Sequence, residues 1–164
     1  MKSMKKVLVL MLSLLLVVGM FGCSKEVKTA EYTNGEIVLQ LPEGMEEEFG
    51  EGDFEYTISK NDMIVYVSSI TKQELADDYG FSDIDLKTFT DLIVNGDEVI
   101  LRKSYSDYEV FAYTSKVEGD EYYYLIGCYE TDDKFFIVNF VCFASDRKKF
   151  EDPFLDYASK VKFK

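Results

Sequence analysis

The stretch Phe135-Phe136-Ile137-Val138-Asn139-Phe140-Val141-Cys142-Phe143 decides the fold that this sequence predicts. It is apolar almost without interruption, and its β-branched and aromatic side chains favour a β-strand. Successive side chains of a strand point to opposite faces of a sheet, so this strand is apolar on both faces and needs cover on both. The stretch therefore predicts a layered sandwich, in which helices pack on each side of a sheet.

The segment before this strand predicts a hairpin that turns at Asp132-Asp133. Around such a turn, the numbers of paired residues sum to about 265, so that Cys128 faces Ile137 and Cys142 faces Tyr123. Two cysteines in an exported chain raise the possibility of a disulfide. In this register, however, the two sulfurs lie further apart than a bridge allows. We therefore expect both cysteines to be small buried hydrophobic residues.

Alternating or apolar segments bounded by turn residues predict the other strands. They lie at residues 36–41, 54–59, 63–70, 99–105, 108–117 and 121–130. Thr71 and Glu74 have the spacing of a capping box, which predicts a helix through Tyr79 that Gly80 ends. A second helix is predicted from Asp83 or Asp85 to Asn95.

A last helix is predicted from Ser145 or Asp146 onward, because apolar residues recur at helical spacing near the C-terminus. Pro153 falls inside this pattern. It predicts a kink near Glu151, with Asp152 capping a second helical segment that has Pro153 at its first position. Residues 162–164 are expected to form a short extension.

The N-terminal segment is typical of a secretory signal. Three lysines precede an uncharged core over residues 7–21, which is shorter than the roughly 20 apolar residues of a spanning helix. The core ends at Met20-Phe21-Gly22-Cys23 and resembles a bacterial lipoprotein signal, where a small residue precedes a cysteine. The resemblance implies cleavage before Cys23 and lipidation of its thiol. An uncleaved signal anchor, or a free cysteine after a plain signal, is the alternative.

These patterns divide the chain into a signal peptide (residues 1–22), a lipidated cysteine with a flexible tether (23–34) and one globular domain (35–164). The whole chain has 18 basic and 31 acidic residues. Removing the signal, with its three lysines, lowers the formal charge from −13 to −16. Such a chain is repelled by nucleic acid and by anionic lipid headgroups.

The sequence has no histidine, which removes the commonest general base and the commonest zinc ligand. No phosphate-binding glycine loop is present. Hydrolysis by a pair of carboxylates stays open, because acidic residues are frequent and their pairing is spatial. We therefore predict no catalytic residue, no cofactor and no enzymatic activity.

Several diffuse motifs suggest a family. They are Leu41-Pro42-Glu43-Gly44, Tyr122-Tyr123-Tyr124, the apolar strand quoted above, and Ala158-Ser159-Lys160-Val161-Lys162-Phe163. In their order over residues 35–164, they resemble the PsbP-like (DcrB-like) superfamily. The resemblance implies an α+β fold, with an antiparallel sheet of six to seven strands between helices on both faces (an α/β/α sandwich). Members of that family are accessory and interaction proteins without a shared active site, so no site residue is carried over.

Two sets of residues are candidates for binding. The first is an acidic loop that could offer oxygen ligands to Ca²⁺, although a solvated, self-repelling surface is the favoured interpretation: Glu46, Glu47, Glu48, Glu51 and Asp53. The second is a tyrosine-rich sheet face, represented by Tyr113, Tyr122 and Tyr124; such residues more often complete the packing of a half-exposed sheet.

We therefore predict a non-catalytic lipoprotein on the extracytoplasmic face of a bacterial cell membrane. It is held to the membrane by a lipid on Cys23 and binds an unidentified envelope protein, but not nucleic acid. The alternative is a binding module for a small ligand or Ca²⁺, which would use the acidic loop or the tyrosine face.

Overall fold

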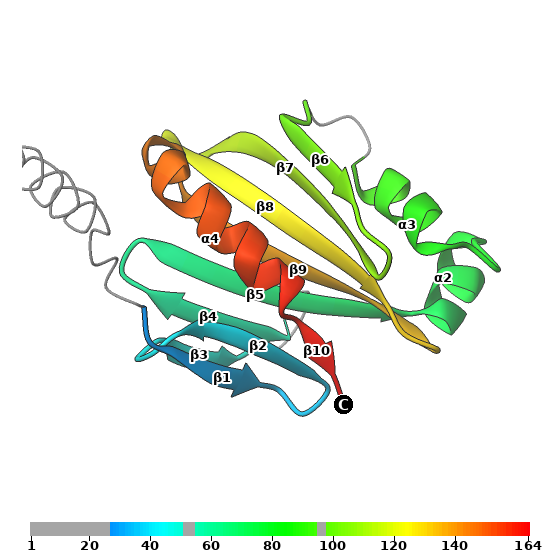
Figure 1. The fold of residues 1–164 in the computed structure, drawn as a ribbon. Helices are drawn as coiled ribbons and strands as arrows, with labels where there is room; N and C mark the ends of the chain where they lie inside the picture. The colour runs from blue at the N-terminus through cyan, green and yellow to red at the C-terminus, as the bar shows by residue number, and fades with distance from the viewer. Residues whose placement is uncertain (1–26, 51–54, 95–97) are drawn as a thin grey trace, which may run out of the picture.

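The computed structural model describes residues 27–50, 55–94 and 98–164. Seven strands form an antiparallel sheet in the order β3-β4-β5-β9-β8-β7-β6 (Figure 1). Their bounds are β3 Glu46–Phe49, β4 Tyr56–Lys60, β5 Met63–Thr71, β6 Leu101–Ser104, β7 Tyr108–Val117, β8 Asp120–Glu130 and β9 Lys134–Phe143. The predicted α+β class, with a seven-stranded antiparallel sheet between helices, is confirmed.

Strand β9, which contains the apolar stretch, lies at the centre of this sheet between β5 and β8. Its register against β8 is the predicted one, because Cys128 pairs with Ile137 and Tyr123 pairs with Cys142. Both cysteines are buried and free, as expected.

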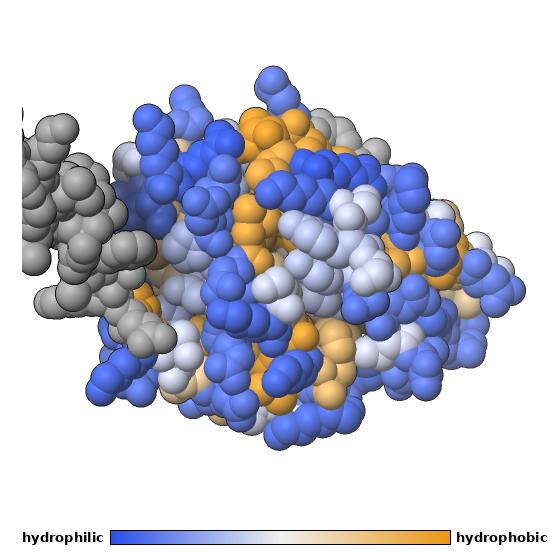
Figure 2. Space-filling model, viewed as in Figure 1, coloured by the Kyte–Doolittle hydropathy of each residue, from blue (hydrophilic) through white to orange (hydrophobic). Residues whose placement is uncertain are grey.

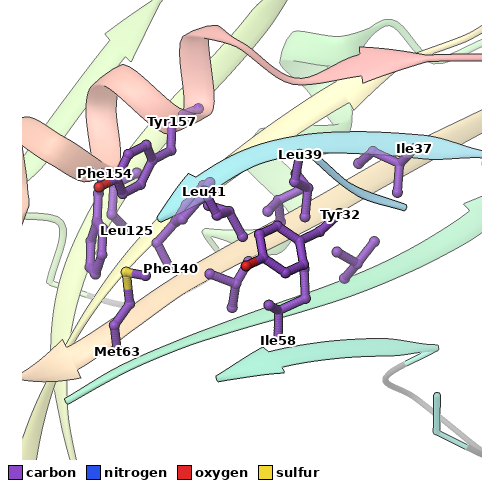
Figure 3. Close-up of a cluster of buried hydrophobic side chains, with 14 of the residues drawn as sticks. Tyr32, Ile37, Leu39, Leu41, Ile58, Met63, Leu125, Phe140, Phe154 and Tyr157 are labelled. Atoms are coloured by element: carbon purple, nitrogen blue, oxygen red, sulfur yellow. The ribbon is translucent and has the colours of Figure 1, made fainter. Parts of the chain in front are cut away.

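One face of the sheet is covered by α4 (Arg147–Ser159) and a second sheet of three strands. This second sheet has β2 (Ile37–Pro42) in its centre, with β1 (Thr29–Thr33) and β10 (Lys162–Phe163) on its edges. Figure 3 shows the apolar cluster between these layers, to which both sheets and α4 contribute. Its fully buried members include Ile37, Leu39, Leu41, Ile58, Leu125, Phe140 and Phe154.

Strand β1 corrects the predicted tether, which was expected to continue to Asn34. Tyr32 explains the difference, because its ring is buried in the cluster of Figure 3. Its hydroxyl donates to the Pro42 carbonyl at 2.9 Å and accepts from the Met45 N–H at 3.0 Å. The folded domain thus begins at or before Thr29. The expected C-terminal extension is likewise part of the fold, since it forms β10.

The other face of the seven-stranded sheet is covered by α2 (Lys72–Tyr79) and α3 (Leu86–Ile93). The predicted capping box of α2 is confirmed, with Gly80 in a left-handed conformation after its last turn. Asp85 caps α3, and Phe89 of this helix stacks on Phe135 at 4.2 Å.

Helix α4 continues through Pro153, so the predicted second cap at Asp152 is wrong. Proline at this position removes the hydrogen bond to the carbonyl four residues earlier, at Lys149. Lys149 is exposed, while Phe154 and Tyr157 hold the following turns in the core. The burial of Phe154 and Tyr157 therefore stabilises the helix more than Pro153 destabilises it.

The predicted acidic loop is also wrong in its first half, because Glu46–Phe49 forms the edge strand β3. It pairs with β4, and Phe49 stacks on Tyr56 with ring centroids 5.0 Å apart. Glu51 and Asp53 lie outside the described residues.

Candidate interaction surface

The face that α2 and α3 cover continues beyond these helices as an aromatic surface, of which Tyr113 and Tyr124 pack against the apolar cluster under the helices. Strand alternation brings Tyr66, Tyr113, Tyr122, Tyr124 and Phe143 to this part of the face. We call these five residues the tyrosine patch. The four tyrosines are half-buried and Phe143 is 41% exposed, so the rings are packed but accessible.

Cross-strand pairing sets the geometry of the patch. Tyr113 pairs with Tyr124, and their rings stack at 5.0 Å with planes 7° apart. Tyr122 pairs with Phe143, and their rings stack at 5.1 Å. Stacked rings cover each other's faces, so the patch presents ring edges and phenolic hydroxyls.

The phenol of Tyr124, in the patch, stays neutral at ordinary pH. Burial raises the pKa of Tyr124, and the neighbouring phenols of Tyr66 and Tyr122 raise it further. Neutral tyrosines combine apolar area with a polar tip and are enriched at protein interfaces. The patch therefore has the composition of a protein-binding surface.

A small cavity of about 120 Å³ deepens the surface at the end of the patch. Tyr122 and Phe143 line it together with Asn61, Asp62, Ile64, Val141 and Cys142. It is too small for most organic ligands, which need about 300 Å³ or more, but it fits one side chain of a partner.

All three predicted tyrosines, Tyr113, Tyr122 and Tyr124, thus lie in one surface. Tyr123, which separates two of them in the sequence, points to the other face, is fully buried and donates to Glu151 at 2.9 Å. Tyr129 is also on that face, with its hydroxyl on the Ala158 carbonyl. The number of tyrosines does not show which of them are buried and which lie in the patch. The alternation of side chains along β8 does, because neighbouring residues point to opposite faces of the sheet.

Of the predicted calcium ligands, the three that the structure describes do not share one face of the sheet. Glu46 and Glu48 pair with Ser59 and Thr57 and so lie on the face of the tyrosine patch. Glu47 lies on the opposite face, where the Tyr56 hydroxyl donates to it. Over the described ranges, no group of three or more Asp, Glu or Cys side chains is placed to hold a metal ion.

A larger cavity of about 500 Å³ lies beside α2, at the far end of the same face. Apolar residues Leu75, Phe81 and Phe135 share it with acidic ones, and Lys72 donates to Glu130 at 2.7 Å on its wall. This volume is within the range of small-molecule sites. Sequence reasoning did not find this cavity, because its wall combines α2, the α2–α3 linker and the β8–β9 hairpin.

The thiols do not provide a nucleophile. Burial raises the pKa of Cys128 and of Cys142 to about 12 in each case, so neither is a thiolate near neutral pH. The buried carboxylate of Glu109 has structural partners, since it accepts from Ser104 at 2.9 Å and faces Arg102 at 3.7 Å.

No family model and no curated protein matches the sequence. Solved structures that match include cyanobacterial PsbP (CyanoP) from Synechocystis sp. PCC 6803, with a TM-score of 0.48, 14% identity and coverage of 90% of this chain and 99% of that one.

Two further structures have a TM-score of 0.50. LpqN of Mycobacterium tuberculosis, described as involved in cell envelope biogenesis, is 10% identical, with 85% of this chain and 92% of that chain covered. A protein of Bacteroides thetaiotaomicron VPI-5482 is 12% identical over 78% of this chain, which spans only 45% of that protein. At these identities the likeness is one of fold.

Among the helices of the described residues, none has the length and apolarity needed to cross a bilayer. Hydrophilic side chains dominate the face seen in Figure 2, where apolar surface is divided among separate areas.

Proposed function

We propose that this chain is a non-catalytic lipoprotein of the bacterial cell envelope that binds another envelope protein through the tyrosine patch. A lipid on Cys23 holds it to the extracytoplasmic face of the membrane. The single observation that carries the binding role is the patch itself, in which four half-buried tyrosines and the exposed Phe143 form one aromatic surface on the main sheet.

The anchor is supported by the sequence Gly22-Cys23 after a short apolar core. More than one acyl chain is needed for durable membrane binding, and a diacylglyceryl group meets that condition. The non-catalytic role is supported by the absence of histidine and by the raised pKa of both buried thiols.

Affinity purification from native membranes tests the binding role. We expect the wild-type chain to recover a partner that the Tyr113→Ala/Tyr124→Ala variant loses. Tyr79→Ala is the matched control, because Tyr79 is 65% exposed on α2 and lies outside the patch. Equal recovery by the double variant and the control, with both variants folded, would exclude the patch as the binding surface.

The second candidate function is a binding module for a small ligand, supported by the cavity of about 500 Å³ beside α2. A ligand that binds only the folded state raises the melting temperature. Thermal-shift measurements with envelope metabolites and with millimolar Ca²⁺ test this function, and an unchanged melting temperature throughout would remove it.

A further inference from the structure

The position of β1 limits how far the domain can move from its anchor. Only residues 24–28 separate Cys23 from Thr29, the first residue of β1. An extended chain spans at most about 3.3–3.6 Å per residue, so the first residue of β1 lies within about 20 Å of the lipidated cysteine.

A chain of contacts shows which end of the main sheet lies at this point. The Lys28 carbonyl accepts from the Glu43 N–H at 3.0 Å, and the Glu43 carbonyl accepts from the Lys60 ammonium at 2.5 Å. Lys60 pairs with Met63 across the β4–β5 turn. In Figure 1, the start of β1 (blue), this turn and the start of α4 (orange) lie together at the left end of the molecule.

The tyrosine patch belongs to the same end. Met63 pairs with Cys142, which is next to Phe143 of the patch, and Phe143 pairs with Tyr122. Tyr124 follows two residues later, about 7 Å along the strand. The β8–β9 turn and α2 lie at the opposite end, about 26 Å further along β9.

We propose that the partner of the tyrosine patch is a segment of an integral membrane protein that lies close to the bilayer surface. This inference rests on the proposed anchor and binding role, and it names the class of partner. Strand β1 belongs to the second sheet, on the face opposite the patch, but it starts at the same end of the main sheet. The anchor therefore holds the patch near the bilayer, whereas the cavity beside α2 lies at the far end.

The charges beside the patch define the chemistry of this segment further. Glu46 and Glu48 are exposed on the edge strand β3 and lie on the face of the patch. Ser59 and Ile64 connect Glu46 to Val141, which pairs with Tyr124 of the patch, in one row across the sheet. The complementary segment therefore has an apolar or aromatic centre and lysine or arginine on one side.

The test changes the distance between anchor and patch in the full chain, expressed in its native cell. A photo-crosslinking amino acid replaces Ser115, which is exposed, pairs with Tyr122 and borders the patch. One variant has a helical spacer of 30 residues after Ser24, which lifts the domain by about 45 Å. The matched control has the same spacer after Lys164, where the distance between anchor and patch does not change.

We expect a crosslinked membrane protein with the native tether and with the C-terminal spacer, and at least a tenfold lower yield with the N-terminal spacer. An undiminished yield with the N-terminal spacer would overturn the membrane-proximal location, while the binding role of the patch would stand. Absence of a protein adduct in all three variants would instead remove the binding role, and adducts to lipid alone would identify the bilayer as the occupant.

Charge reversal tests the basic side of the partner. Glu46→Lys/Glu48→Lys is expected to lower the adduct yield severalfold, whereas Asp132→Lys/Asp133→Lys, at the far end of the sheet, leaves it unchanged. An equal loss from both pairs would show a general charge effect and overturn the proposed complementarity.

Discussion

The ring of Tyr129 lies directly over Gly127. A Cβ atom added to Gly127 would come within 2.5 Å of the Tyr129 hydroxyl oxygen and within 2.8 Å of its ring. The same hydroxyl donates to the Ala158 carbonyl at 2.9 Å, so Tyr129 connects β8 to the last turn of α4 across the glycine.

Gly127→Ala is therefore expected to destabilise the fold by about 2 kcal/mol, because a buried ring must move to admit one methyl group. Urea unfolding monitored by circular dichroism measures the change. In a Tyr129→Ala background, the same glycine substitution should cost much less. Additive costs of the two substitutions would contradict the steric relationship.

The pair of Arg102 and Glu109 gives a second prediction. Glu109 is only 6% exposed, so Arg102→Met leaves a buried carboxylate with Ser104 as its remaining partner and should cost about 3 kcal/mol. The double variant Arg102→Met/Glu109→Met should lose less stability than the two single variants lose together. Lys160→Met is the control, because its ion pair with Asp156 is exposed and should contribute under about 0.5 kcal/mol.

Stability is expected to fall at alkaline pH. Burial raises the pKa of Cys128 and Cys142 to about 12, whereas an unfolded chain loses these protons near pH 9. Below pH 9 both the folded and the unfolded chain keep these protons, so the two thiols make their full contribution to the free energy of unfolding. Between about pH 9 and pH 12 only the unfolded state ionises, so the free energy of unfolding decreases.

Urea unfolding at a series of pH values measures this decrease. Burial also raises the pKa of Tyr129, which acts in the same direction above pH 10. Cys128→Ala should show a smaller loss between pH 7 and pH 11 than the wild type. An identical pH profile for this variant would mean that Cys128 is not the source.

Cys23→Ser tests the lipid anchor. We expect the wild-type mature chain to begin at a Cys23 that carries acyl chains, and the variant to lack them and to leave the membrane fraction. Mass spectrometry of the N-terminus and fractionation measure the two effects. A variant that stays membrane-bound, next to a wild type without acyl chains, would point to an uncleaved signal anchor.

The sequence predicted the elements whose pattern is strong and local. The turn at Asp132-Asp133 determined the register of β8 and β9, and the capping box determined the start of α2. Strand β3 was missed because Glu46, Glu47 and Glu48 have neither alternation nor strand propensity. It is stabilised by pairing with β4 and by the stack of Phe49 on Tyr56, both of which are tertiary contacts.

The candidate surface was predicted only in part. Tyrosine frequency indicated a sheet face, and Tyr113, Tyr122 and Tyr124 do share one. Their accessibility depends on how far α2 and α3 extend over the sheet, which no local pattern specifies. The larger cavity beside α2 likewise arises from segments that are far apart in the sequence.

Strand β2 has β1 on one edge and β10 on the other, so the first and last strands of the domain belong to one small sheet. A chain made from its N-terminus delivers β2 early and Lys162–Phe163 much later. One edge of β2 therefore stays unpaired until nearly the whole domain has been made, and closing such a long-range contact is slow. A chain truncated before Lys162 leaves this edge of β2 open to proteases.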